Sequence, residues 1–183
     1  LSYYAFQLLY WCGIRSGELL ALTPADFNFQ KRTLRINKSY QRLKGEDVIS
    51  TPKTKNSIRT VTMPKFLCDE MQDCLKLYYS LQPDDRIFPV TKYYLNHEME
   101  RGCKASGVKK IRVHDLRHSH VSLLINMSYT ALAIGKRVGH SAEKITYRYA
   151  HLFPSVQQDM ADQLDAENMN EESNDREGGL AYV

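Results

Sequence analysis

The chain has 183 residues, enough for one domain with a hydrophobic core and a short appendage. Its 43% hydrophobic content fits a soluble globular protein, and no apolar run approaches the ~20 residues needed to cross a membrane. Residues 1–158 carry 24 Lys and Arg against 13 Asp and Glu, whereas the remainder carries one base and eight acids. A basic body followed by an acidic tail indicates an anionic partner such as nucleic acid for the body.

The cysteines and the first residues bear on where the protein works. Four cysteines (Cys12, Cys68, Cys74 and Cys103) are scattered without a C-x-x-C pair. This pattern indicates reduced structural thiols in a cytosolic protein and argues against a zinc site made of cysteines. The chain opens inside an amphipathic pattern without a signal peptide, so we expect a fragment whose N-terminal neighbours have been removed.

The first third of the chain predicts two helices and a sheet. Apolar residues at helical spacing predict a helix over residues 1–12 closed by Gly13, then a second helix after a tight turn, stopped by Thr23-Pro24. Residues 33–62 change to an alternating pattern. They predict a three-stranded antiparallel sheet with apolar positions at 34–36, 48–49 and 58–63.

The remainder predicts mostly helices, over residues 65–80, 91–106 and 114–127, then a short one over 130–138 that ends at Gly139. Ser141 is expected to cap a helix that carries Tyr147 and Tyr149, and Pro154-Ser155 to start a last helix with Met160 and Leu164. The predicted fold class is α+β, mainly α-helical with a small antiparallel sheet. We assign a catalytic domain to residues 1–165 and an acidic C-terminal tail to residues 166–183.

The region 114–149 concentrates residues suited to phosphodiester chemistry. Arg117 offers a planar fork of donors that matches a phosphate, and histidine exchanges protons near neutral pH. Tyrosine can act as a covalent nucleophile once its proton is removed. Arg15 lies near a helix start, where Glu18 one turn later would fix its side chain. His114, His118 and His120 raise the possibility of a metal site, but no H-E-x-x-H motif accompanies them.

Together these motifs resemble the tyrosine recombinases, the phage-type integrases, in particular those of Gram-positive integrative conjugative elements and phages. The resemblance covers residues 1 to about 165, and its boxes occur in the family's order. The matching residues are Arg15 in G-x-R-x-G-E-L-L-x-L; Lys53 in P-K-T-x-x-S-x-R-T; His114, Leu116, Arg117 and His118 in H-x-L-R-H; Gly139, His140 and Ser141 in G-H-S; and Thr146, Tyr149, Ala150 and His151 in T-x-x-Y-A-H.

The resemblance implies the catalytic domain of a site-specific DNA recombinase with the fold of DNA breaking-rejoining enzymes. Its tyrosine attacks the scissile phosphate, forms a 3′-phosphotyrosyl link and releases a 5′-hydroxyl. The hydroxyl of a partner duplex then reverses this step, and two such rounds pass through a Holliday junction. Because the link conserves the phosphodiester's energy, no ATP is expected. The arginines, histidines and tyrosine together suggest phosphodiester chemistry without a metal, so no metal cofactor is expected either.

The implied roles fall on particular residues. Tyr149 would be the nucleophile, and Arg15 and Arg117 would hold the nonbridging phosphate oxygens. His114 would accept the tyrosine's proton or help to hold the phosphate, and His140 would donate to the phosphate. Lys53 would protonate the leaving oxygen. The supporting residues would be Glu18 and Asp115.

Two assignments stay open at this point. Tyr147 competes with Tyr149 as the nucleophile, although the spacing from His140 favours Tyr149, and Lys55 competes with Lys53 as the acid. Other bases are expected to contact the DNA backbone, which makes binding salt-dependent without reading sequence. The predicted contacts are Lys38, Arg42, Lys55, Lys109, Lys136 and Arg148.

The expected partners are double-stranded attachment sites, with an excisionase or host DNA-bending protein as a candidate accessory and no membrane. We expect a homotetramer on DNA, joined by the helix with Met160 and Leu164 or by the end at Leu180–Val183, and a monomer or weak oligomer for the isolated domain. The setting is the bacterial cytoplasm, at the nucleoid. Competing functions are a topoisomerase of type IB, a non-catalytic DNA-binding module and, less well matched, a metal-dependent nuclease.

Overall fold

A computed structural model of the protein describes residues 1–52, 57–152 and 160–164. The chain divides into two units, Leu1–Ala150 and His151–Val183. In the second unit, residues 160–164 are helical and exposed. The start of the predicted last helix and all of the predicted acidic tail lie outside the described residues. The domain boundaries at 165 and 166 therefore stay a prediction.

The first unit begins with helix α1 (Ser2–Cys12), which ends at Gly13 as predicted. The second predicted helix is confirmed only as the single turn α2 (Ser16–Leu19). Beyond it the chain continues in tighter turns, and the backbone N–H of Ile87 donates to the carbonyl of Leu22 at 2.9 Å. Residues 20–22, which follow α2, are all buried, so this segment fills the core as turns and does not continue the helix.

Five further helices follow, and all were predicted to within a few residues. They are α3 (Lys65–Lys76), α4 (Lys92–Ser106), α5 (Asp115–Asn126), α6 (Ala131–Val138) and α7 (Ala142–Tyr149). Gly107 and Gly139 end α4 and α6 in the left-handed conformation that glycine adopts without steric cost. The Ser141 hydroxyl accepts from the backbone N–H of Lys144, as expected of a helix cap. Two 3-10 turns, η1 (Pro24–Asp26) and η3 (Ala150–Leu152), are also present.

The small antiparallel sheet is confirmed, but its strands differ from those predicted. It comprises β1 (Phe27–Asn28), β2 (Thr33–Ile36) and β5 (Arg59–Thr62), in the order β1-β2-β5. The segment around Val48 belongs instead to a separate hairpin of β3 (Ser39–Leu43) and β4 (Glu46–Ser50). Lys44 and Gly45 both have positive φ, which gives the tight two-residue turn that pairs β4 with β3.

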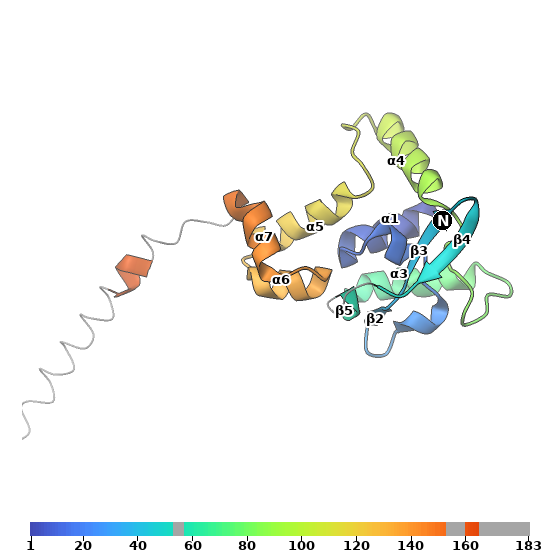
Figure 1. Ribbon diagram of the computed structural model, residues 1–183, viewed down its shortest axis with the longest axis horizontal. Coiled ribbons are helices and arrows are strands. Elements are labelled where there is room, and N and C mark those ends of the chain that lie inside the picture. The colour runs from blue at the N-terminus through green and yellow to red at the C-terminus, as the bar shows by residue number, and fades with distance from the viewer. Residues whose placement is uncertain (53–56, 153–159, 165–183) are drawn as a thin grey trace, which may run out of the picture. The chain divides into compact units, whose positions relative to one another are not determined.

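The core of the first unit lies around α1. Helix α1 packs on α3 and on α5, which follows it by more than 100 residues (Figure 1). Strand β5 contacts α6, and α6 contacts α7. All four cysteines are buried free thiols, in agreement with the predicted reduced state. Among the described residues, no helix is long and apolar enough to cross a membrane.

Gly13 gives a test of this packing. A Cβ built there would lie 2.4 Å from Cδ2 of His120, and the φ of +62° is itself strained for alanine. We expect Gly13→Ala to lower the free energy of unfolding by about 1–3 kcal/mol, measured by urea denaturation. Gly107→Ala is the matched control, because its φ is +70° but no atom lies within 4 Å of its Cβ. Equal losses in both variants would contradict the role of the His120 contact.

Candidate active site

Three arginines converge on the end of α6. They come from the α1–α2 turn, β5 and α5, and each donates to one of three successive backbone carbonyls. The pairs are Arg59 with Arg137 at 2.9 Å, Arg117 with Val138, and Arg15 with Gly139 at 3.4 Å. The last carbonyls of a helix have no partner within the helix and carry partial negative charge, so they attract cations. These contacts fix the turn that carries His140.

Glu18 organises two of these arginines. Its carboxylate accepts from the Arg15 guanidinium at 2.8 Å and from both terminal nitrogens of Arg59 at 2.8 and 3.0 Å. The contact between Glu18 and Arg15 predicted from the sequence is therefore present. Burial alone would raise the pKa of Glu18, but the hydrogen bonds and charges of Arg59 and Arg15 outweigh it and lower the pKa below its usual value.

Arg117 is the most enclosed of the three arginines, with 3% of its surface exposed. Its guanidinium also donates to the carbonyl of Gly13, so it joins the α1–α2 turn to the end of α6. Burial lowers the pKa of Arg117 to about 9, and the nearby charge of Arg15 adds to the effect. The side chain is still cationic at pH 7. A local excess of positive charge close to the surface suits an anionic oxygen.

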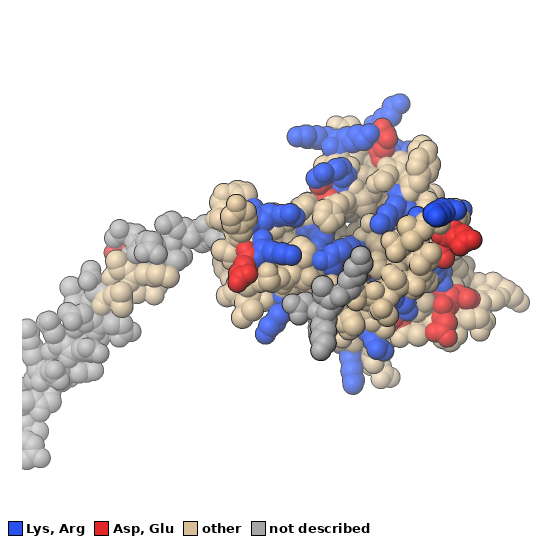
Figure 2. Space-filling view, viewed as in Figure 1, with Lys and Arg blue, Asp and Glu red and all other residues tan. Residues whose placement is uncertain are grey.

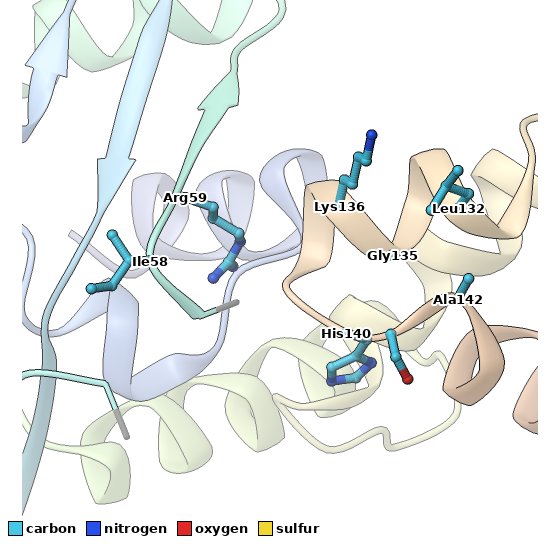
Figure 3. A pocket seen from close by; sticks show the side chains of 8 residues that line it. Ile58, Arg59, Leu132, Gly135, Lys136, His140 and Ala142 are labelled. Carbon is cyan, nitrogen blue, oxygen red and sulfur yellow. The ribbon is translucent and has the colours of Figure 1, made fainter. Parts of the chain in front are cut away.

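His140 lies at the edge of this cationic cluster. A pocket beside it is lined by Arg59, Lys136 and the apolar side chains of Ile58 and Leu132 (Figure 3). Burial, followed by the charges of Arg117 and Arg15, lowers the pKa of His140 to about 4. His140 is therefore neutral at pH 7 and can donate one ring N–H to a ligand.

The two candidate tyrosines on α7 differ in burial, because Tyr147 is exposed and Tyr149 is buried. Tyr147 is 92% exposed, whereas Tyr149 is 8% exposed and its hydroxyl contacts Nδ1 of His118. Burial raises the pKa of Tyr149, while the charges of Arg148 and Arg117 act in the opposite direction. Tyr149 thus faces the histidines of α5, and Tyr147 faces solvent.

His114 precedes α5 and stands edge-on to His118, with their ring centres 4.9 Å apart. Burial lowers the pKa of His114, and His118 and Arg117 contribute further. Asp115, predicted to support the site, accepts hydrogen bonds from the backbone N–H and the guanidinium of Arg112. Arg112 holds the pKa of Asp115 at about 2, so this acid acts on the histidines through its charge.

The predicted DNA contacts divide into two groups. Lys38 forms an ion pair within the fold, with its Nζ 2.8 Å from Oδ2 of Asp26. Arg42, on the exposed hairpin, has its Nη1 3.7 Å from Oδ1 of Asp47. Three further predicted contacts are also exposed, and two of these line the pockets next to His140; the three are Lys109, Lys136 and Arg148. Lys53 and Lys55 lie outside the described residues, so their assignment stays a prediction.

Two side chains at the site were not assigned from the sequence. Arg59 is the arginine of the S-x-R-T segment that follows Lys53, and its pairing with Glu18 spans 41 residues. His118 belongs to the H-x-L-R-H box, where only its first histidine and its arginine received roles. Within the described part of the chain, no three His, Cys, Asp or Glu side chains lie close enough to hold a metal ion.

Comparison with known proteins identifies the family. The model of the phage integrase family matches residues 2–155, which is most of the chain and includes every side chain described above. The chain belongs to the phage integrase family. The predicted resemblance to tyrosine recombinases is thereby confirmed.

Curated relatives agree with this assignment. The integrase of ICEBs1 from Bacillus subtilis strain 168 is 36% identical over 176 residues, covering 87% of this chain and 47% of the relative. The integrase of Staphylococcus phage L54a is 30% identical over 171 residues, covering 84% and 48%. The chain therefore spans about half the length of the integrases it matches.

Solved structures show the same fold. The Tn1549 transposon integrase in complex with circular intermediate DNA aligns with a TM-score of 0.73 at 21% identity, over 91% of this chain and 59% of that one. The catalytic domain of bacteriophage HP1 integrase aligns with a TM-score of 0.57 at 18% identity, over 87% and 79%. At these identities the likeness confirms the α+β fold class of an integrase catalytic domain.

Proposed function

We propose that this chain is the catalytic part of a site-specific DNA recombinase that integrates or excises a mobile element. The observation that carries the proposal is the buried Tyr149, whose hydroxyl contacts His118 and which lies within range of the charges of Arg148 and Arg117, in a chain of the phage integrase family. Tyr149 attacks the scissile phosphodiester, and the strand is then exchanged through a Holliday junction.

The scissile phosphate binds where the three arginines meet the end of α6. The Arg15 side chain keeps 35% of its surface exposed and can turn donors toward a phosphate while Glu18 holds the guanidinium. The buried Arg117 supplies positive charge to the phosphate, and His140 donates a hydrogen bond to one of its oxygens. Such fixed donors stabilise the additional negative charge of the pentacoordinate transition state better than water does, because they need no reorganisation.

The reaction exchanges one phosphate ester for another. The phenolic oxygen of Tyr149 forms a bond to phosphorus as the bond to the 5′-oxygen breaks, and Lys53 is proposed to protonate that oxygen. Free tyrosine ionises near pH 10, and burial raises the pKa of Tyr149 further. The phenol therefore needs a proton acceptor beside it for attack near neutral pH.

The proposed partners follow from charge and from the solved relatives. Lys and Arg outnumber Asp and Glu on the face of the molecule seen in Figure 2. The Tn1549 transposon integrase and the XerH recombinase were solved with their DNA. We infer that this chain binds double-stranded attachment sites, works as a homotetramer on DNA with an accessory DNA-bending protein or excisionase, and acts in the bacterial cytoplasm.

Trapping the covalent intermediate tests the proposed function. Full-length protein is incubated in EDTA with its element's junction DNA, nicked beside the scissile phosphate so that the short leaving strand diffuses away. A denaturing gel should show a protein–DNA adduct, and addition of a duplex with a complementary 5′-hydroxyl should convert the adduct into joined DNA. Absence of an adduct on the element's own junction would contradict the proposal. If the protein forms the adduct and relaxes supercoiled plasmids but never joins a partner duplex, it would be a topoisomerase.

Arg117→Lys should separate charge from geometry at this site. Lysine keeps the positive charge but cannot reach the carbonyls of Gly13 and Val138 together or present a fork to the phosphate. We expect adduct formation under single-turnover conditions to slow about 100- to 1000-fold. Arg101→Lys is the control, because Arg101 is an exposed arginine paired with Glu98 on α4. An unchanged rate in a folded Arg117→Lys protein would remove Arg117 from the phosphate site.

A further inference from the structure

The residue that touches the Tyr149 hydroxyl is His118. The contact joins Nδ1 of His118, the fourth residue of α5, to the phenolic oxygen of Tyr149 on α7, and the two ring centres lie 6.0 Å apart. Tyr149 is 8% exposed, so water has little access to its hydroxyl. His114, the first histidine of the H-x-L-R-H box, instead packs its ring edge-on against His118.

The protonation states of this pair permit proton transfer. Burial lowers the pKa of His118 below 6.5, and burial raises the pKa of Tyr149 above 10. At pH 7 a neutral imidazole therefore faces a neutral phenol. The tautomer with its proton on Nε2 leaves the lone pair of Nδ1 free to accept the phenolic O–H.

Charged and titratable groups surround His118 from both packed helices and from the turn before α5. Burial and the positive charges among these groups lower the pKa of His118, whereas the one acid acts in the opposite direction. These groups are Arg148 and Tyr149 on α7; Arg117 and Asp115 on α5; and Arg112 and His114 before α5.

We propose that His118 is a catalytic residue, the general base that removes the proton of Tyr149 during strand cleavage. The inference rests on the proposed function and refines it by moving this role from His114 to His118. In the step, the Tyr149 O–H bond breaks and its proton passes to Nδ1, the phenolic oxygen bonds to phosphorus, and the 5′-oxygen leaves with a proton from the proposed acid Lys53. His118 returns the proton to the phenolic oxygen when the partner strand reverses the reaction.

If His118 is the general base, His114 can have a separate role in holding the phosphate. Its side chain stands beside His118 and Arg117 at the start of α5, where it can donate to a phosphate oxygen. The two histidines of the box would then have separate functions, His118 toward the nucleophile and His114 toward the phosphate.

The test replaces His118 with asparagine in the full-length protein. The amide oxygen of asparagine can stand where Nδ1 stands and accept the phenolic hydrogen bond, but it cannot take the proton. Adduct formation at pH 7 should fall about 100- to 10,000-fold. His97→Asn is the matched control, because His97 is an exposed histidine on α4. Thermal unfolding of both variants shows whether the fold survives.

The pH profile distinguishes a base from a residue that only positions Tyr149. The wild-type cleavage rate should fall as the pH drops through the lowered pKa of His118, because the imidazolium has no free lone pair. The His118→Asn variant should not show this fall in rate near the pKa of His118. Its cleavage rate should instead rise with pH as more of Tyr149 ionises, so that the ratio of the wild-type rate to the variant rate becomes smaller at alkaline pH. A variant with the wild-type profile would overturn the inference.

DNA with a bridging 5′-sulfur tests whether His118 acts on the nucleophile or on the leaving group. When the bridging 5′-oxygen of the junction DNA is replaced by sulfur, the leaving thiolate needs no acid. Lys53→Ala should then recover its rate, whereas His118→Asn should stay slow. Rescue of His118→Asn by sulfur would overturn the inference by making His118 an acid. If the wild type forms no adduct on either substrate, the proposed function fails, and the proton-transfer step fails with it.

Discussion

Tyr149→Phe should form no covalent adduct with junction DNA, whereas Tyr147→Phe should form it at close to the wild-type rate. Phenylalanine lacks the only atom that bonds to phosphorus in the proposed step, so no part of the activity can remain on Tyr149. Tyr147 lies two residues away on the same helix but is 92% exposed, whereas Tyr149 is 8% exposed and faces His118. The measurement is the denaturing gel with nicked junction DNA in EDTA.

Folding and DNA binding must be shown to survive in the Tyr149→Phe protein. Loss of the hydroxyl removes one hydrogen bond to His118, with an expected cost of about 1 kcal/mol in the free energy of unfolding. Binding to junction DNA should be unchanged within a few-fold, because the cationic cluster stays intact. Retention of the adduct in Tyr149→Phe together with its loss in Tyr147→Phe would shift the nucleophile to the exposed tyrosine.

Glu18→Gln should destabilise the fold by about 3–5 kcal/mol, because it removes the buried charge that balances Arg15 and Arg59. Glutamine has nearly the same size as glutamate, so the loss isolates the charge. Two guanidinium groups, with Arg117 close by, would then face one another without an acid between them. Urea unfolding at pH 7 measures the effect. Glu46→Gln, an exposed change on β4, is the control and should stay within about 0.5 kcal/mol.

The loss should depend on pH in a defined direction. Because the pKa of Glu18 is lower in the folded protein than in the unfolded chain, its contribution is fully present above pH ~4.5 and declines as the pH falls through the folded value. The difference in unfolding free energy between wild type and Glu18→Gln should therefore shrink below pH 4.5. A difference that stays constant down to pH 3 would contradict the assigned ion pairs.

Local sequence signals were sufficient for the ends of three helices, α1, α4 and α6. Gly13, Gly107 and Gly139 each end a helix with φ between 62° and 72°, as their places after apolar periodic segments predict. A stop signal of this kind depends on the backbone freedom of one residue, so it can be found without knowing the rest of the fold.

The strands were harder to predict because their partners are set by turns. Tyr40 is buried, but Leu43 and Ile49 are half exposed, so the hairpin shows only a weak alternation of apolar and polar residues. Its two-residue turn at Lys44 and Gly45 decides the pairing, and this turn was interpreted as a connection between strands of a single sheet. The apolar run at residues 19–22 likewise predicted a longer helix, but residues 20–22 are not helical and are buried in the core.

The site was predictable where a motif carries the chemistry and unpredictable where contacts are long-range. Arg15, Arg117 and His140 come from distant boxes, and the structure brings them together at the end of α6. Tyr149, the last residue of α7, contacts His118 on α5. No local pattern could show that Arg59 reaches Glu18, or which histidine of α5 meets Tyr149, because those contacts depend on how α5, α7 and β5 pack.

Mapping the residue that carries the DNA tests the central claim most directly. After trapping, the adduct is digested with nuclease and then with trypsin, which cuts after Lys144 and Arg148 and so places the two tyrosines on different peptides. Mass spectrometry should find the residual nucleotide on peptide 149–176, attached through the phenolic oxygen of Tyr149. A nucleotide on peptide 145–148, which holds Tyr147, would contradict the account.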